Sequence, residues 1–73
     1  MKEEELDNIF TYHKPFNNQA DRYEAIRKEA RQFAVFINSA CPDSREKSLA
    51  ITKLQECVMF ANAAIALHEK ESL

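Results

Sequence analysis

The 73-residue chain contains no glycine, two prolines and two cysteines. Without glycine, the Gly-rich loops that cradle phosphates and the tight primed turns of β-hairpins are excluded. The acidic start MKEEELDN lacks the apolar segment of a secretory leader, so we expect Cys41 and Cys57 to be reduced thiols in a cytosol. The longest apolar run, Val58–Leu67, is interrupted by Asn62 and falls short of the roughly 20 residues that span a membrane.

The length predicts one domain over residues 1–73 and a small core. Such a chain buries only about 60% of its unfolded surface, and one core of that size supplies ~3–5 kcal/mol, so a partner or staple is expected. The net charge of −2 is unevenly spread, with −3 over residues 1–7, +2 over residues 8–68 and −1 over residues 69–73. This distribution indicates a small anionic ligand rather than a long polyanion such as DNA.

Apolar spacing predicts an all-α fold with helices at about 2–10, 18–40 and 43–69, the last two forming an antiparallel hairpin with the short helix folded against one end. Pro15 and Pro42 separate the helices, and Asn17 or Asn18 is the expected N-cap of the second. Asp43 and Glu46 have the spacing of a capping box for the third. Intervals of three and four residues define the expected seam: Tyr23, Ile26, Ala30, Phe33, Ile37 and Ala40, then Ile51, Leu54, Val58, Ala61 and Ile65.

The third helix is apolar on more than one side. Beside its seam lie Cys57, Phe60, Ala64 and Leu67, with Met59 and Ala63 beyond them. A two-helix hairpin has one partner face, and monomers rarely expose the remaining apolar surface, so we expect a homo-oligomer.

Metal, catalytic and DNA-binding signals are weak. The possible ligands His13, His68, Cys41 and Cys57 show no zinc spacing, and Cys57 is most simply a small core residue. No strand-turn-helix elbow presents a nucleophile, so we do not expect an enzyme. We also expect no metal and no cofactor. The turn is too short and the chain too acidic for a helix-turn-helix protein.

The stretch FTYHKPFNNQADRYEAIRKEAR, residues 10–31, has two interpretations. In one, Phe10 and Tyr12 pack an N-terminal arm onto the hairpin and the cations form a solvated surface. In the other, an aromatic ring stacks on a base and an arginine binds phosphate. Helical spacing places Arg27 and Arg31 together, one turn after Tyr23.

A second polar cluster lies in SREKSLAITKLQE, near the start of the third helix. Its hydroxyls and cations suit either capping with surface ion pairs or a phosphate at a helix N-terminus. The residues concerned are Arg45, Ser48, Thr52 and Lys53.

Four motifs together resemble one family: F-x-Y-H-x-P, Q-x-x-R-Y-x-x-I-R, C-P-x-S-R-E-K-S-L-A-x-T-K-L-x-E and V-M-x-A-N-A-A-I-A. They span residues 8–66 and are similar to the phage sponges that bind cyclic oligonucleotide messengers and block CBASS immunity. Thoeris-inhibiting sponges share this hairpin, many with a β-rich insertion between its helices. The present chain has no room for that insertion and looks like the compact CBASS branch.

The resemblance implies a sponge that does not cleave its ligand, assembles as a homo-oligomer (commonly a hexamer) and acts in the cytoplasm of the infected bacterial host. It implies that Tyr12 stacks on a base and that Arg27, where some members have lysine, contacts phosphate. His13, Pro15 and Arg22 are expected in the wall of the same cyclic-dinucleotide site. Some members also hold cyclic trinucleotides, for which the second polar cluster is the candidate.

The preferred ligand stays open between cyclic di-adenylate, cyclic GMP–AMP, trinucleotides and cyclic ADP-ribose variants. The alternative from another class is a structural or regulatory hairpin that binds a protein partner. DNA and membranes are not expected partners.

Overall fold

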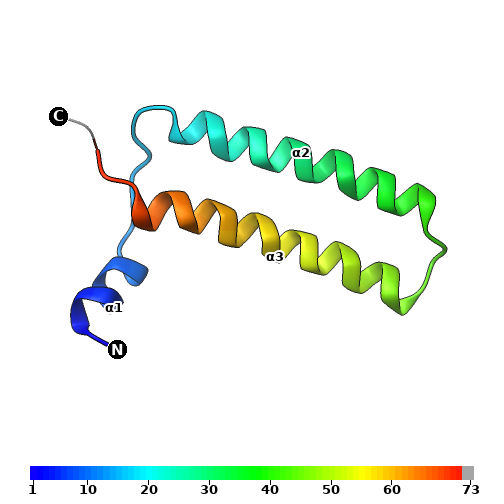
Figure 1. The fold of residues 1–73 in the computed structure, drawn as a ribbon, viewed down its shortest axis with the longest axis horizontal. Helices are drawn as coiled ribbons and strands as arrows, with labels where there is room; N and C mark the ends of the chain where they lie inside the picture. Colours follow the sequence, from blue (N-terminus) through cyan, green and yellow to red (C-terminus); the bar gives the residue numbers. More distant parts are fainter. Residues whose placement is uncertain (72–73) are drawn as a thin grey trace.

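The computed structural model describes residues 1–71, which form three α-helices: α1 (Glu3–Phe10), α2 (Gln19–Ala40) and α3 (Arg45–His68). No β-strand occurs in this range, which confirms the all-α prediction. Helices α2 and α3 lie side by side and antiparallel, joined at one end by residues 41–44 (Figure 1). Helix α1 lies at the opposite end of the hairpin, next to the C-terminal turn of α3 (Figure 1).

The molecule is a flat layer with extents of 48 × 29 × 13 Å. Its radius of gyration is 15.7 Å, whereas a compact chain of this length has about 11 Å. Within residues 1–71, no apolar side chain is fully buried. The hairpin therefore has an interface between two helices but no enclosed core.

The α3 half of this interface follows the predicted seam, since all five expected residues are half-buried. In α2 the prediction holds at Tyr23, Ile26, Ala30 and Ile37 but is wrong at Phe33, which is 55% exposed, and at Ala40, which is also exposed. An α-helix advances by 3.6 residues per turn, so a strict 3–4 pattern drifts away from its partner. The half-buried positions in α2 are Arg22, Tyr23, Ile26, Ala30, Ala34 and Ile37, so Ala34 takes the place expected for Phe33.

The start of α3 differs by one residue from the predicted capping box. Ser44 is the N-cap, and its Oγ accepts a hydrogen bond from the backbone N–H of Lys47 at 3.1 Å. Asp43 lies outside the helix and pairs with Lys47 Nζ at 2.8 Å, which lowers the pKa of the Asp43 carboxyl. Lys47 Nζ also donates to the Asn38 carbonyl oxygen at 2.8 Å, so this side chain ties the end of α2 to the start of α3.

Helix α1 does not pack its apolar residues on the hairpin, contrary to the expectation of a helix folded against one end. Leu6 is 40%, Ile9 45% and Phe10 82% exposed. The extended segment around Pro15 carries α1 beyond the end of α3 (Figure 1). The contact is polar: Asn8 Nδ2 donates to the Leu67 carbonyl oxygen at 3.1 Å.

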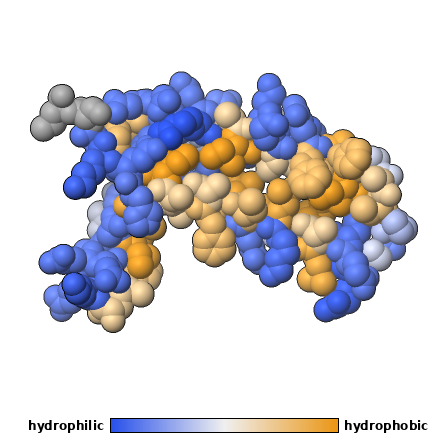
Figure 2. All heavy atoms as spheres, viewed as in Figure 1, coloured by the Kyte–Doolittle hydropathy of each residue, from blue (hydrophilic) through white to orange (hydrophobic). Residues whose placement is uncertain are grey.

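Apolar side chains remain on the outer surfaces of the hairpin. Met59 and Phe60 of α3 are 67% and 74% exposed, and Phe36 of α2 is 64% exposed. Cys57 is exposed too, so it is not the core residue that the sequence suggested. Figure 2 shows this apolar surface extending along the hairpin between hydrophilic patches.

By length and composition, α3 is the one helix of the described chain that could cross a membrane. This property is a weak indication, because a core helix of a soluble protein passes the same test.

Candidate functional site

A shallow groove between α2 and α3 is the most promising site. One hollow, of about 460 Å³, lies next to the arm, defined as residues 11–18. A second hollow, of about 390 Å³, shares Arg27 and Met59 with the first, so the two form one groove along the hairpin. Around the first hollow are His13, Tyr23, Arg27, Met59, Asn62, Ala63 and Ala66. The groove thus combines an apolar floor with a few polar groups, as small-molecule sites commonly do.

Arg27 is one of the two arginines that line this groove. Its side chain is exposed and lines both hollows. No hydrogen bond or ion pair joins it to the described residues. Arg31 lines the second hollow, one turn further along α2. A guanidinium without an internal partner can bind a phosphate with two parallel hydrogen bonds.

His13 brings the arm to the edge of the groove. It is half-buried, and its Nε2 lies 2.6 Å from the Asn8 carbonyl oxygen. Since a carbonyl oxygen only accepts, Nε2 carries the proton in this contact. His13 and Arg27 are therefore the two predicted site residues that line the same hollow.

Asn62 was noted in the sequence only as an interruption of an apolar run, although it lines the groove. Its Oδ1 is buried and accepts no hydrogen bond from the described residues. A buried acceptor left without a donor costs about 1–3 kcal/mol. The sequence signal for this role was the position of Asn62 within the apolar run VMFANAAIAL, because a buried amide needs a hydrogen-bond partner.

The other predicted residues of this site lie apart from the groove lining. Tyr12 is on the arm and 82% exposed, and Pro15 is exposed on the same arm. Tyr12 and Phe10 are both 82% exposed. They therefore do not pack the arm onto the hairpin, as the first interpretation of residues 10–31 expected. An aromatic ring in solvent next to His13 is available for stacking.

Arg22 is already occupied. Its Nη1 and Nη2 donate to the two carboxylate oxygens of Glu69 at 2.7 and 2.5 Å, and its Nε donates to Asn18 Oδ1 at 3.0 Å. The hydrogen bond to Glu69 raises the pKa of the Arg22 guanidinium. Sequence spacing could not reveal this pair, because its members are 47 positions apart.

The second polar cluster is spread over the exposed surface of α3. Arg45, Ser48, Thr52 and Lys53 are all exposed. Lys53 Nζ lies 3.4 Å from Glu56 Oε2. Ser48 lines a hollow together with Asn38, Asp43, Ser44, Lys47 and Ile51. Among residues 1–71, no group of three or more His, Cys, Asp or Glu side chains is placed to hold a metal ion.

Comparison with known proteins identifies one family. Residues 2–66 match the family described as "Acb2/Tad1, hairpin domain". This is the family of anti-CBASS and Thoeris sponges, so the resemblance read from the four motifs is confirmed. No curated protein and no solved structure matched the chain.

Proposed function

Because this chain belongs to the Acb2/Tad1 hairpin family, whose general role is that of a cyclic-nucleotide sponge, we propose that it sequesters cyclic dinucleotides made by CBASS immunity. It holds the messenger without cleaving it, in the cytoplasm of an infected bacterium, and so keeps it from the host effector. Residues 41–44 join α2 directly to α3 and carry no inserted domain. This short connection supports the compact CBASS branch over the Thoeris branch.

The observation that carries the proposal is Arg27, an arginine that lines an apolar groove and has no hydrogen-bond or ion-pair partner among residues 1–71. A dinucleotide offers the matching groups: a phosphate for the guanidinium, and bases for the apolar floor and for aromatic faces. Tyr12 adds a solvent-exposed ring on the arm, next in sequence to His13, which lines the groove. Asn62 adds an acceptor that a base amine can satisfy once the amide turns toward the groove.

Assembly of several subunits is part of the proposal. The flat hairpin has no enclosed core within residues 1–71, and Met59, Phe60 and Phe36 expose large apolar side chains. Monomeric proteins rarely expose such surface. A homohexamer, the assembly common in the family, would cover these faces.

Cyclic trinucleotides are a second ligand class for the same protein. Arg45, Ser48, Thr52 and Lys53 offer two hydroxyls and two cations on the exposed surface of α3. Copies of this surface around a threefold axis would form one site per three subunits. The exposed apolar faces also fit the alternative of a hairpin that binds a protein partner, and nucleotide titration separates the two.

The test is isothermal titration of the purified chain with a panel of cyclic dinucleotides and one cyclic trinucleotide. Saturable binding near one dinucleotide per subunit or per two subunits supports the sponge. A separate stoichiometry near one trinucleotide per three subunits supports the second site. Ligand recovered intact after heating the complex excludes hydrolysis. If no cyclic di- or trinucleotide binds but a cyclic ADP-ribose does, the chain belongs with the Thoeris sponges; if none binds, the protein-partner alternative stands.

A further inference from the structure

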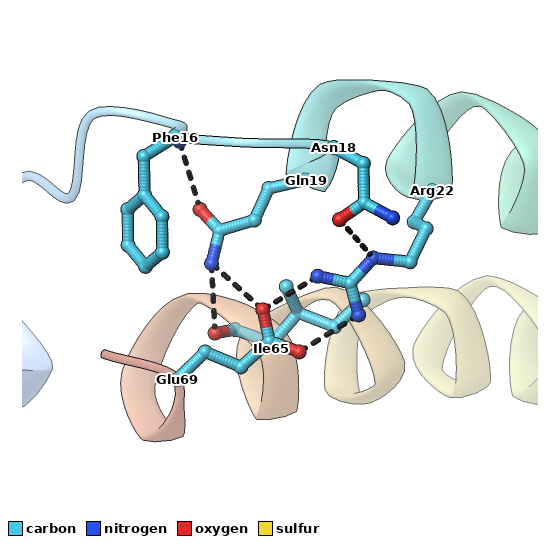
Figure 3. A network of polar contacts seen from close by, with 6 residues as sticks. All are labelled: Phe16, Asn18, Gln19, Arg22, Ile65 and Glu69. Atoms are coloured by element: carbon cyan, nitrogen blue, oxygen red, sulfur yellow. Dashed lines mark hydrogen bonds and ion pairs between the residues drawn. The ribbon is translucent and has the colours of Figure 1, made fainter. Parts of the chain in front are cut away.

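The one buried side chain of residues 1–71 is polar. Gln19 is 2% exposed and lies at the first turn of α2. Its Oε1 accepts from the Phe16 backbone N–H at 3.1 Å, while its Nε2 donates to Glu69 Oε1 at 3.0 Å and to the Ile65 carbonyl oxygen at 3.5 Å (Figure 3). Buried glutamine is uncommon unless its amide is bonded on both sides, and here it is.

Gln19 shares the Glu69 carboxylate with Arg22. We name Gln19, Arg22 and Glu69 the clasp; it joins the start of α2 to the C-terminal end of α3 (Figure 3). The hydrogen bonds from Arg22 and then from Gln19 lower the pKa of Glu69 to about 2, so the carboxylate stays charged at neutral pH. A two-point bond between arginine and carboxylate fixes direction as well as distance.

The clasp also holds the end of the arm. It bonds the Phe16 N–H through Gln19 and the Asn18 side chain through Arg22. Between them, Asn17 has a φ of 51°, in the left-handed region that asparagine tolerates better than most residues. The other end of the arm is tied by His13 to Asn8, whose side chain bonds α3 at Leu67.

We propose that the clasp is a positioning device for ligand binding, with Gln19, Arg22 and Glu69 fixing the arm so that His13 lines the groove, and Tyr12 next to it on the arm is already ordered, before the ligand arrives. The inference rests on the function proposed above and assigns Arg22 to internal positioning instead of phosphate contact. An arm that is ordered in advance loses less conformational freedom on binding. Loosening it therefore weakens affinity without removing any ligand contact.

The decisive variant is Glu69→Gln, which keeps the shape of the side chain and removes its charge. The expected result is faster hydrogen exchange at the Phe16 amide and about tenfold weaker dinucleotide binding. The dependence of affinity on salt should stay as in the wild type, because no phosphate contact is lost. Arg27→Gln is the contrast: it should weaken binding and also reduce the salt dependence. Glu71→Gln removes the same charge from an exposed residue two positions later. It should leave the hydrogen exchange of the Phe16 amide, the affinity and its salt dependence unchanged.

Charge exchange separates positioning from simple damage to the fold. The double variant Arg22→Glu, Glu69→Arg restores an ion pair in reverse but not the bonds of this pair to Gln19 and Asn18, so it should recover part of the affinity that either single change loses. If Glu69→Gln speeds exchange in the arm but binds normally, the positioning role is overturned. If Arg22→Gln reduces the salt dependence as Arg27→Gln does, Arg22 contacts phosphate and the inference fails. A wild-type chain that binds no cyclic nucleotide overturns the proposed function itself. That result differs from the two above, in which the wild type binds and only the positioning role fails.

Discussion

Tyr12→Ala is the sharpest test of the proposed site. The ring is 82% exposed, so its removal takes almost no buried surface from the folded chain and the unfolding midpoint should not change. Stacking of a base on an aromatic ring contributes about 1–3 kcal/mol, which corresponds to a loss of roughly 5- to 150-fold in affinity. Isothermal titration with the best-bound dinucleotide measures this loss, and circular dichroism checks the fold.

Two variants at the same position identify the cause. Tyr12→Phe keeps the aromatic face and should bind within about threefold of the wild type, since only the hydroxyl is removed. Tyr12→Leu keeps an apolar side chain without the aromatic face and should resemble the alanine variant. Wild-type affinity in both Tyr12→Ala and Tyr12→Leu would refute the stacking role and move the site to the groove alone.

Four further predictions concern the cap, the groove, the surface and acid. Ser44→Ala removes the N-cap of α3 and should lower the free energy of unfolding by about 1 kcal/mol in denaturant titrations, whereas Ser48→Ala should not. Asn62→Leu removes a buried acceptor without a donor; it should raise that free energy by about 1 kcal/mol and weaken nucleotide binding, and unchanged binding would show that no ligand uses the amide. Phe60→Asp places a charge on an exposed apolar face, so light scattering after gel filtration should report smaller particles. The Glu69 pKa falls from 4.5 to about 2 on folding, so its stabilising effect is complete above pH 4.5 and is lost as the pH falls toward 2; Glu69→Gln should remove this part of the acid sensitivity.

The helices and most of their interface were predictable because they follow from local spacing. Leu54 and Val58 are half-buried as the seam of α3 requires. Phe33 was misplaced because the choice between it and Ala34 depends on how far α2 has rotated past its partner, which a repeat pattern does not give. The start of α3 was misjudged because Asp43 and Ser44 are both good caps and only the backbone decides between them.

The family resemblance led us to expect His13 and Arg27 in one site, and they line one hollow, while their role in binding stays a prediction. The contacts between residues distant in sequence could not be predicted. Gln19 is a polar residue at a helix start that any sequence reading assigns to the surface. Its burial depends on Glu69, 50 positions away. Arg22 is bonded to the same carboxylate, so its guanidinium is paired within the chain.

The lack of an enclosed apolar core within residues 1–71 affects how the number of binding sites depends on protein concentration. Under the proposed assembly, the contacts that stabilise the hairpin lie largely between subunits, so folding and assembly form one equilibrium whose midpoint rises with protomer concentration. A monomeric binder captures ligand in proportion to its copy number. This chain would instead gain binding sites steeply once its concentration passes a threshold, with little capacity below it.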